Sequence, residues 1–164
     1  AGGLPSMAAV HLTGNPSHSY DHDDYKNDQR QLNKLFELMD DADDKNYSIM
    51  SCSPGQGEAD LGTGIAAGHA YSVVEIWKVD TNRGMERLLK IRNPWGRVEW
   101  KGDWSDNSSL WTPQLRAQCG SVVGNDGFFF MRFEDYITNF RSTDICVDNN
   151  SAAVHNRVKA NMTS

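Results

Sequence analysis

One stretch in the first third of the chain has apolar positions at the spacing of a helix. Its five apolar side chains fall at i, i+3, i+4, i+6 and i+7: Leu32, Leu35, Phe36, Leu38 and Met39. Side chains at this spacing lie along one helix face, which is typical of a helix packed on a core. Acidic residues before the stretch favour the positive end of the helix dipole. The pattern predicts a helix over residues 28–41.

Other stretches have the pattern of strands. Residues 70–79 and 85–91 are rich in β-branched and aromatic side chains, and the turn-forming residues 80–84 separate them. This arrangement predicts a β-hairpin. Residues 47–52 alternate between apolar and polar positions, and the apolar run 128–131 follows an Asn-Asp-Gly turn. Both are predicted to be strands.

The remaining stretches have weaker patterns. We expect one or two short strands or loops around residues 8–12, a glycine-rich loop at 53–67 and a tryptophan-rich loop at 93–111. Short helices are expected at residues 113–119 and 134–139. A last strand is expected at 142–147. Together these elements predict an α+β fold with antiparallel sheets and a few flanking helices.

Composition and charge narrow the class of protein. The chain has 164 residues, a net charge of −6 and a pI near 5.2, which argues against nucleic acid or an anionic membrane as main partner. It contains no run of 18 apolar residues, so no membrane span is expected. The three cysteines are widely spaced, which is typical of reduced thiols in a cytoplasmic protein.

The length fits one domain, or one lobe of a larger unit. Residues 1–147 are predicted to form that domain. Residues 148–164 are polar and are predicted to be a linker or a tail. Because the chain begins at Ala1 rather than at Met, we expect a preceding segment.

The first residue with catalytic potential is His69, in the run Gly-His-Ala-Tyr-Ser-Val at the start of the predicted hairpin. It follows the glycine-rich loop, and a strand end beside a loop is a common place for catalytic residues. Position alone favours a structural histidine over a catalytic one.

Asn93 lies at the far end of the partner strand, in the run Arg-Asn-Pro-Trp-Gly. If the turn is centred near Thr81 or Asn82, His69 and Asn93 lie opposite each other or within a residue or two. Opposed residues in an antiparallel pair are about 4.5–5.5 Å apart at Cα, close enough for an amide to bind an imidazole. An imidazole held by such an amide can deprotonate a cysteine thiol. This pairing depends on the register.

Several motifs, in order and spacing, resemble the second catalytic subdomain of the calpains. They are Gly68-His69-Ala70-Tyr71-Ser72, Arg92-Asn93-Pro94-Trp95-Gly96, Val98-Glu99-Trp100, Gly102-Asp103-Trp104-Ser105-Asp106 and Asp126-Gly127-x-Phe129. The resemblance covers roughly residues 8–147. It implies one barrel-like lobe of a papain-like cysteine protease, a calcium-dependent endopeptidase that cleaves proteins or peptides.

The resemblance also implies roles for particular residues. His69 matches the general base, Asn93 the amide that orients it, and Trp95 the tryptophan beside the active-site cleft. The nucleophilic cysteine belongs to a preceding subdomain of the same parent protein. The chain alone is therefore expected to be inactive, and that cysteine-bearing subdomain is its expected partner.

Calcium is the cofactor that the resemblance implies. Glu99, Asp106 and Asp126 match the family's carboxylate ligands in this half, with a carbonyl near Gly124, and calcium takes six to eight oxygen ligands. The sequence departs from the family at Phe128, where a further acidic ligand is usual, so a weaker or absent site is also compatible.

Two other interpretations stay open. A calpain-like protein that has lost activity would use the same fold as a binding or scaffold module. An unrelated sugar- or peptide-binding module would use the tryptophans, which otherwise pack the loop against the body. Of the cysteines, Cys52 and Cys146 are interpreted as small buried side chains. Cys119 is allowed to be exposed and has no assigned role.

Overall fold

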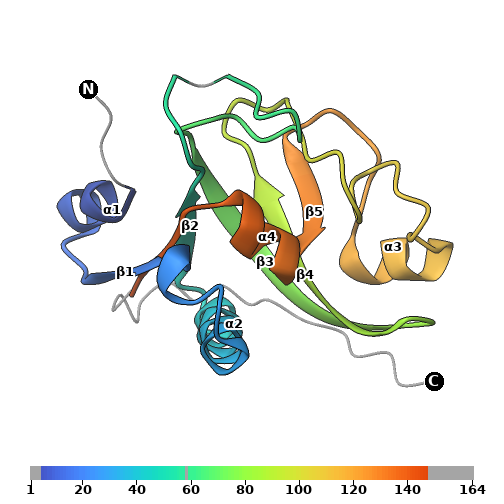
Figure 1. Cartoon of the computed structure of the whole chain (residues 1–164), viewed down its shortest axis with the longest axis horizontal. Helices are drawn as coiled ribbons and strands as arrows, with labels where there is room; N and C mark the ends of the chain where they lie inside the picture. The colour runs from blue at the N-terminus through green and yellow to red at the C-terminus, as the bar shows by residue number, and fades with distance from the viewer. Residues whose placement is uncertain (1–4, 58, 148–164) are drawn as a thin grey trace.

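The computed structural model describes residues 5–57 and 59–147 (Figure 1). Within these residues, six strands form one sheet in the order β1-β6-β2-β3-β4-β5, and every neighbouring pair is antiparallel. The predicted α+β class with an antiparallel sheet is confirmed. The sheet is open and does not close into a barrel. Residues 148–164, predicted to be a linker or a tail, lie outside the described residues.

The strands are β1 (Ser17–Asp21), β2 (Ser48–Cys52), β3 (Ala70–Thr81), β4 (Gly84–Arg92), β5 (Phe128–Arg132) and β6 (Ser142–Cys146). The helices are α1 (Pro5–Thr13), α2 (Gln29–Asp44), α3 (Pro113–Cys119) and α4 (Phe133–Asn139), with a short 3-10 turn, η1 (His22–Asp24).

The predicted amphipathic helix is α2. Its start is set by Asp28, whose carboxylate accepts hydrogen bonds from the backbone N–H groups of Arg30 and Gln31. Its end lies three residues beyond the predicted one. The predicted hairpin is β3 and β4, which turn at Asn82 and Arg83 and shift register once, at Val74.

The prediction of a strand or loop around residues 8–12 is wrong, because these residues belong to α1. A short apolar run does not distinguish helix from strand, and Pro5 at the first helical position suits a helix start. Strand β1 was not predicted. Its sequence is polar, and it forms by pairing with β6, more than 100 residues away.

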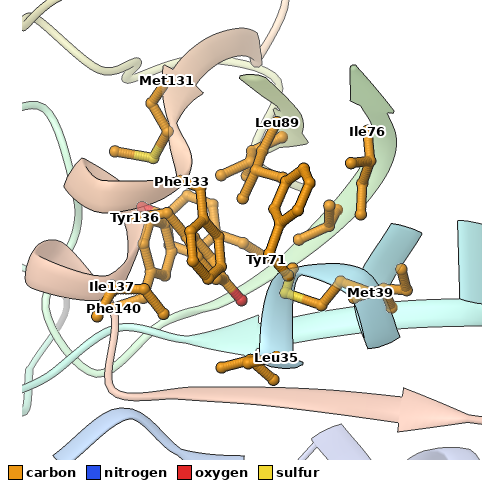
Figure 2. Close-up of a cluster of buried hydrophobic side chains, with 14 of the residues drawn as sticks. Leu35, Met39, Tyr71, Ile76, Leu89, Met131, Phe133, Tyr136, Ile137 and Phe140 are labelled. Carbon is orange, nitrogen blue, oxygen red and sulfur yellow. The ribbon is translucent and has the colours of Figure 1, made fainter. Parts of the chain in front are cut away.

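Apolar side chains pack on both faces of the sheet. One core lies between the sheet and helices α2 and α4, and Figure 2 shows part of it, with Tyr71 and Leu89 of the sheet facing Met39 and Phe133. The other core lies on the opposite face, under α3 and the tryptophan-rich loop.

The tryptophan-rich loop is held by its own indoles. Trp100 is buried in the first core, and Trp104 and Trp111 are buried in the second. The Trp111 indole N–H donates to the carbonyls of Trp104 and Ser105. The prediction that these three indoles pack the loop against the body is confirmed. The loop therefore holds the segment after β4 in place beside the sheet.

Candidate active site

His69 directly precedes β3 and is fixed through its backbone. The Ser53 hydroxyl accepts from the His69 N–H at 2.9 Å and donates to the Ala66 carbonyl at 2.5 Å. Gly68 has a φ of +59°, and a Cβ there would lie 2.9 Å from the Gly55 carbonyl oxygen, so only glycine fits. The strand start and the glycine-rich loop thereby set where the imidazole lies.

Asn93 follows β4 and is fully buried. Its backbone N–H donates to the Gly127 carbonyl at 2.7 Å. Its side-chain Nδ2 donates to two carbonyls, of Arg97 at 2.8 Å and of Val98 at 3.0 Å. Because both amide hydrogens are used, the orientation of the amide is determined by its surroundings.

The two side chains meet at 3.0 Å, between His69 Nε2 and Asn93 Oδ1. Since the amide orientation makes Oδ1 the atom facing the imidazole, Nε2 carries the hydrogen and donates it. The other ring nitrogen, Nδ1, then carries the lone pair. It has no hydrogen-bond partner in the part of the chain that the structure describes. The arrangement leaves a base with one defined reactive atom.

Two aromatic rings pack against the imidazole. The Trp95 ring lies 4.2 Å from it between centroids, tilted by 36°, and the Tyr71 ring meets it edge-on at 4.9 Å. Trp95 is 39% exposed, whereas His69 is 8% exposed. The indole therefore shields the imidazole from water. The Trp95 backbone N–H also donates to Asn93 Oδ1 at 3.0 Å.

The register explains how the pair meets. Ser72 lies opposite Arg92, so extending the ladder sets Asn93 opposite Tyr71, two residues from His69. The predicted separation of a residue or two is confirmed. Sequence reasoning missed the supporting roles of Ser53 and Gly127, because both act through contacts between loops that leave no local pattern.

The three predicted calcium ligands meet at one turn, residues 124–128: Asp126 lies in the turn, and Glu99 and Asp106 bind to its backbone. Glu99 Oε1 accepts from the Gly127 N–H at 2.8 Å, Asp106 Oδ2 from the Gly124 N–H at 2.8 Å, and Asp126 Oδ1 from the Phe128 N–H at 2.9 Å. Burial raises the pKa of Glu99, and so do Asp106 and Asp126. Burial likewise raises the pKa of Asp106, with Asp126 adding to it.

These acids do not form a ready ligand set. Among the described residues, no group of three or more His, Cys, Asp or Glu side chains is gathered closely enough to hold a metal ion. Phe128 contributes a ring flanked by cations, with Lys90 Nζ 5.6 Å and the Arg92 guanidinium 5.4 Å from its centroid. Carboxylate oxygens are ligands that calcium prefers, but the three carboxylates are too far apart in this structure to bind one ion together.

None of the three cysteines forms a disulfide, and none has a hydrogen bond to the imidazole. Burial raises the pKa of Cys119 to about 12. Burial and the nearby Asp144 raise the pKa of Cys52. A nucleophilic thiol needs a lowered pKa, so these thiols have the opposite environment. Two expectations need correction. Cys119, the last residue of α3, is buried, and Cys52 is only half-buried because it ends β2.

Comparison with known proteins fits this geometry. The model of the calpain family cysteine proteases matches residues 1–147. The chain belongs to this family. It is 42% identical to human Calpain-14 over 105 residues, which are 62% of this chain and 15% of that protein. It is 32% identical to Drosophila melanogaster Calpain-A over 157 residues, which are 88% of this chain and 18% of that protein.

A third calpain, mouse Calpain-5, is 35% identical over 161 residues, or 88% of this chain and 25% of that protein. This calpain-family chain thus spans a quarter or less of the length of these relatives. None of the helices in residues 5–57 and 59–147 is long and apolar enough to cross a membrane.

Proposed function

We propose that this chain is the histidine- and asparagine-bearing half, residues 1–147, of a calpain-type cysteine endopeptidase. The observation that carries the proposal is the hydrogen bond from His69 Nε2 to Asn93 Oδ1, which leaves Nδ1 as a base. A thiol from the cysteine-bearing subdomain of the same parent protein would approach Nδ1. Peptide or protein substrates would bind between the two parts.

The proposed reaction uses the imidazole twice. His69 Nδ1 takes the thiol proton, and the thiolate attacks the carbonyl carbon of the scissile peptide bond. The imidazolium then gives that proton to the leaving amine as the C–N bond breaks. Water hydrolyses the resulting thioester with His69 as base, which restores the thiol. Asn93 holds the ring in the productive tautomer throughout, and Trp95 limits the access of water to the pair.

We propose that the chain alone has no peptidase activity. Its three cysteines are free thiols without a hydrogen bond to His69, and Cys119 and Cys52 have raised pKa values. We also propose a cytoplasmic protein, which the three free thiols support.

We propose calcium as a ligand of Glu99, Asp106 and Asp126. The proximity of the three acids supports it, because each of Asp106 and Asp126 raises the pKa of Glu99, and a cation would relieve this repulsion. The acids would have to converge around the ion, since they are not gathered in the structure.

The experiment that tests the proposed function compares peptide hydrolysis by three proteins: the parent protein, its His69→Ala variant and the present chain alone. We expect hydrolysis by the parent only. Hydrolysis by the His69→Ala parent would exclude His69 as the base. A well-folded parent without any hydrolysis would indicate a catalytically inactive binding or scaffold module.

A further inference from the structure

Tyr71, the second residue of β3, contacts two parts of the site at once. Its ring meets the His69 imidazole edge-on, with 4.9 Å between the two centroids. Its hydroxyl accepts a hydrogen bond from the backbone N–H of Ala66 at 2.8 Å. Ala66 is buried and lies near the end of the glycine-rich loop. One side chain therefore joins this loop to the imidazole.

The Tyr71 ring has a fixed position in the first core. It meets the Phe140 ring edge-on at 5.1 Å and the Phe129 ring at 6.2 Å between centroids. Figure 2 shows Tyr71 inside the cluster of buried side chains. Of the two aromatic rings that pack against the imidazole, Tyr71 is the buried one and Trp95 the exposed one. Because close packing holds the Tyr71 ring, the imidazole lies against a surface that does not move.

Both backbone polar groups of Ala66 bind side chains that lie next to His69. The Ala66 N–H donates to Tyr71, and the Ala66 carbonyl accepts from the Ser53 hydroxyl. The same Ser53 hydroxyl accepts from the His69 N–H at 2.9 Å. A shift of Ala66 would therefore disturb the backbone of His69 through Ser53 and the contact with its ring through Tyr71.

The turn that precedes Ala66 is closed by its own hydrogen bonds. Asp60 pairs with Ala66 in an isolated antiparallel bridge. The Asp60 carboxylate also accepts from the N–H groups of Gly62 at 2.8 Å and Gly64 at 3.0 Å. The bond between Ala66 and Tyr71 therefore ties this whole turn to the start of β3.

We propose that Tyr71 is a positioning residue for His69. Its hydroxyl anchors the loop at Ala66, and its ring restricts rotation of the imidazole, so that Nε2 stays on Asn93 and Nδ1 stays available to the thiol. The inference rests on the proposed function for what His69 does. Without the hydroxyl, the buried Ala66 N–H loses its acceptor, and the loop must shift to satisfy it. A misplacement of about 1 Å at a reacting group can cost about 100-fold in rate, so a small shift is measurable.

The first test compares the parent protein with its Tyr71→Phe variant, which keeps the ring and removes the hydroxyl. Tyr136→Phe is the matched control, because the Tyr136 hydroxyl is also buried and is bonded to Thr143 rather than to the loop. We expect both variants to lower the melting temperature by similar amounts. Only Tyr71→Phe should lower kcat, by about tenfold, while KM stays within about twofold. An unchanged kcat in Tyr71→Phe, or an equal loss in both variants, would overturn the proposal.

Nitrogen-15 NMR of the His69 ring in the parent protein gives a measurement that does not depend on catalysis. At a pH where the imidazole is neutral, Nε2 should carry the hydrogen and Nδ1 should not, which gives two well-separated signals. Burial raises the pKa of Tyr71, so its hydroxyl does not titrate in this range. Tyr71→Phe should bring the two signals closer as the tautomers exchange, and Tyr136→Phe should not. Signals that stay in place in Tyr71→Phe would contradict the proposal.

Hydrogen exchange at Ala66 in the unmutated parent tests the anchor without any substitution. The Ala66 N–H should exchange as slowly as the amides within β3, because it is buried and bonded to Tyr71. Exchange as fast as in the exposed turn at Asn82 would overturn the proposal. A parent that cleaves nothing would contradict the proposed function, while the ring signals and the Ala66 exchange would still decide the role of Tyr71.

Discussion

Asn93 shows how one buried side chain can decide the chemistry of its neighbour. Its Nδ2 donates to the carbonyls of Arg97 and Val98, and its Oδ1 accepts from His69 and from the Trp95 backbone. The amide cannot turn over without losing these bonds. The tautomer of His69 is therefore a consequence of how the chain folds after β4.

Replacing Asn93 by Ala in the parent protein should lower kcat by about 100-fold, a loss typical of removing the orientation of a catalytic base. It should also destabilise the fold by about 2 kcal/mol, because the partly buried carbonyls of Arg97 and Val98 lose their donor and the side chain of a buried residue is removed. Peptide hydrolysis and urea unfolding measure the two effects. Asn82→Ala, in the exposed β3–β4 turn, is the control and should change neither. Normal kcat in a folded Asn93→Ala protein would contradict the assigned role.

His22 is a second buried imidazole, with a different role. Its Nδ1 contacts the Phe140 carbonyl at 2.8 Å, and its Nε2 contacts the Thr143 hydroxyl at 2.9 Å, which also meets Tyr136. Burial lowers the pKa of His22 to about 4. The histidine is therefore neutral in the folded protein and ties η1 to α4 and β6.

This lowered pKa predicts a pH dependence of stability. Between pH 6.5 and about 4 the unfolded chain binds a proton at His22 that the folded chain does not, so stability falls as pH falls through this window. The loss should approach about 3 kcal/mol at the lower end. Urea unfolding from pH 7.5 to 4.5 measures it. His22→Asn should flatten this dependence, and His18→Asn, at an exposed position, should not; equal slopes for both variants would disprove the assignment.

Elements with a strong local pattern were predictable, and elements that depend on distant contacts were not. The hairpin of β3 and β4 follows from its β-branched residues and its turn, and it brings His69 near Asn93. Helix α1 and strand β1 have no periodic pattern, and β1 exists only through β6. The register shift at Val74 also has no sequence signal. The pairing of His69 with Asn93 was therefore predictable, whereas its support by Ser53 and Gly127 was not.

Gly127, like Gly68, lies where the backbone beside the site leaves no room for a side chain. Its φ is +85°, and a Cβ there would lie 2.7 Å from the Asn93 carbonyl oxygen. Gly127→Ala should destabilise the fold by more than about 1 kcal/mol and lower the activity of the parent. Thermal unfolding with parallel hydrolysis assays tests this.

Two controls separate strain from contact. Gly84 has a φ of +104°, and a Cβ there would meet no atom within 4 Å. Gly84→Ala therefore measures the cost of backbone strain without a steric clash. Gly124 does not have a positive φ, and the nearest atom to a Cβ there would be Asp126 Oδ2, at 3.8 Å. Gly124→Ala therefore measures the effect of an added methyl group without strain or clash. If Gly127→Ala were no worse than Gly84→Ala, the close approach to Asn93 would not matter.

At the scale of the whole molecule, two cores hold the loops that meet around the site. The first core supports the start of β3, and the second supports the tryptophan-rich loop that carries Glu99 and Asp106. The position of the three acids around one turn follows from this packing. Their proposed role as calcium ligands follows from the family resemblance alone, since isolated acids along a chain carry no local signal for a metal.

Terbium luminescence sensitised by the nearby indoles tests whether these acids bind calcium. Terbium should bind the unmutated chain, calcium should displace it, and Asp106→Asn should weaken binding at least tenfold. The raised pKa values of Glu99 and Asp106 mean that these carboxylates take up protons at a higher pH than ordinary ones. As the pH is lowered, terbium binding should therefore weaken earlier than at a site of ordinary carboxylates. Asp103→Asn in the same loop is the control. Equal binding by Asp106→Asn and the unmutated chain would rule out this site.

The central claim is that His69, oriented by Asn93, deprotonates a thiol from another part of the protein. The most direct measurement is the pH dependence of alkylation of that thiol by iodoacetamide in the parent protein and in its His69→Ala variant. We predict rapid alkylation well below pH 8.5 in the parent, and a shift to the ordinary thiol pKa of about 8.5 in His69→Ala. Identical pH profiles for the two proteins would contradict the account.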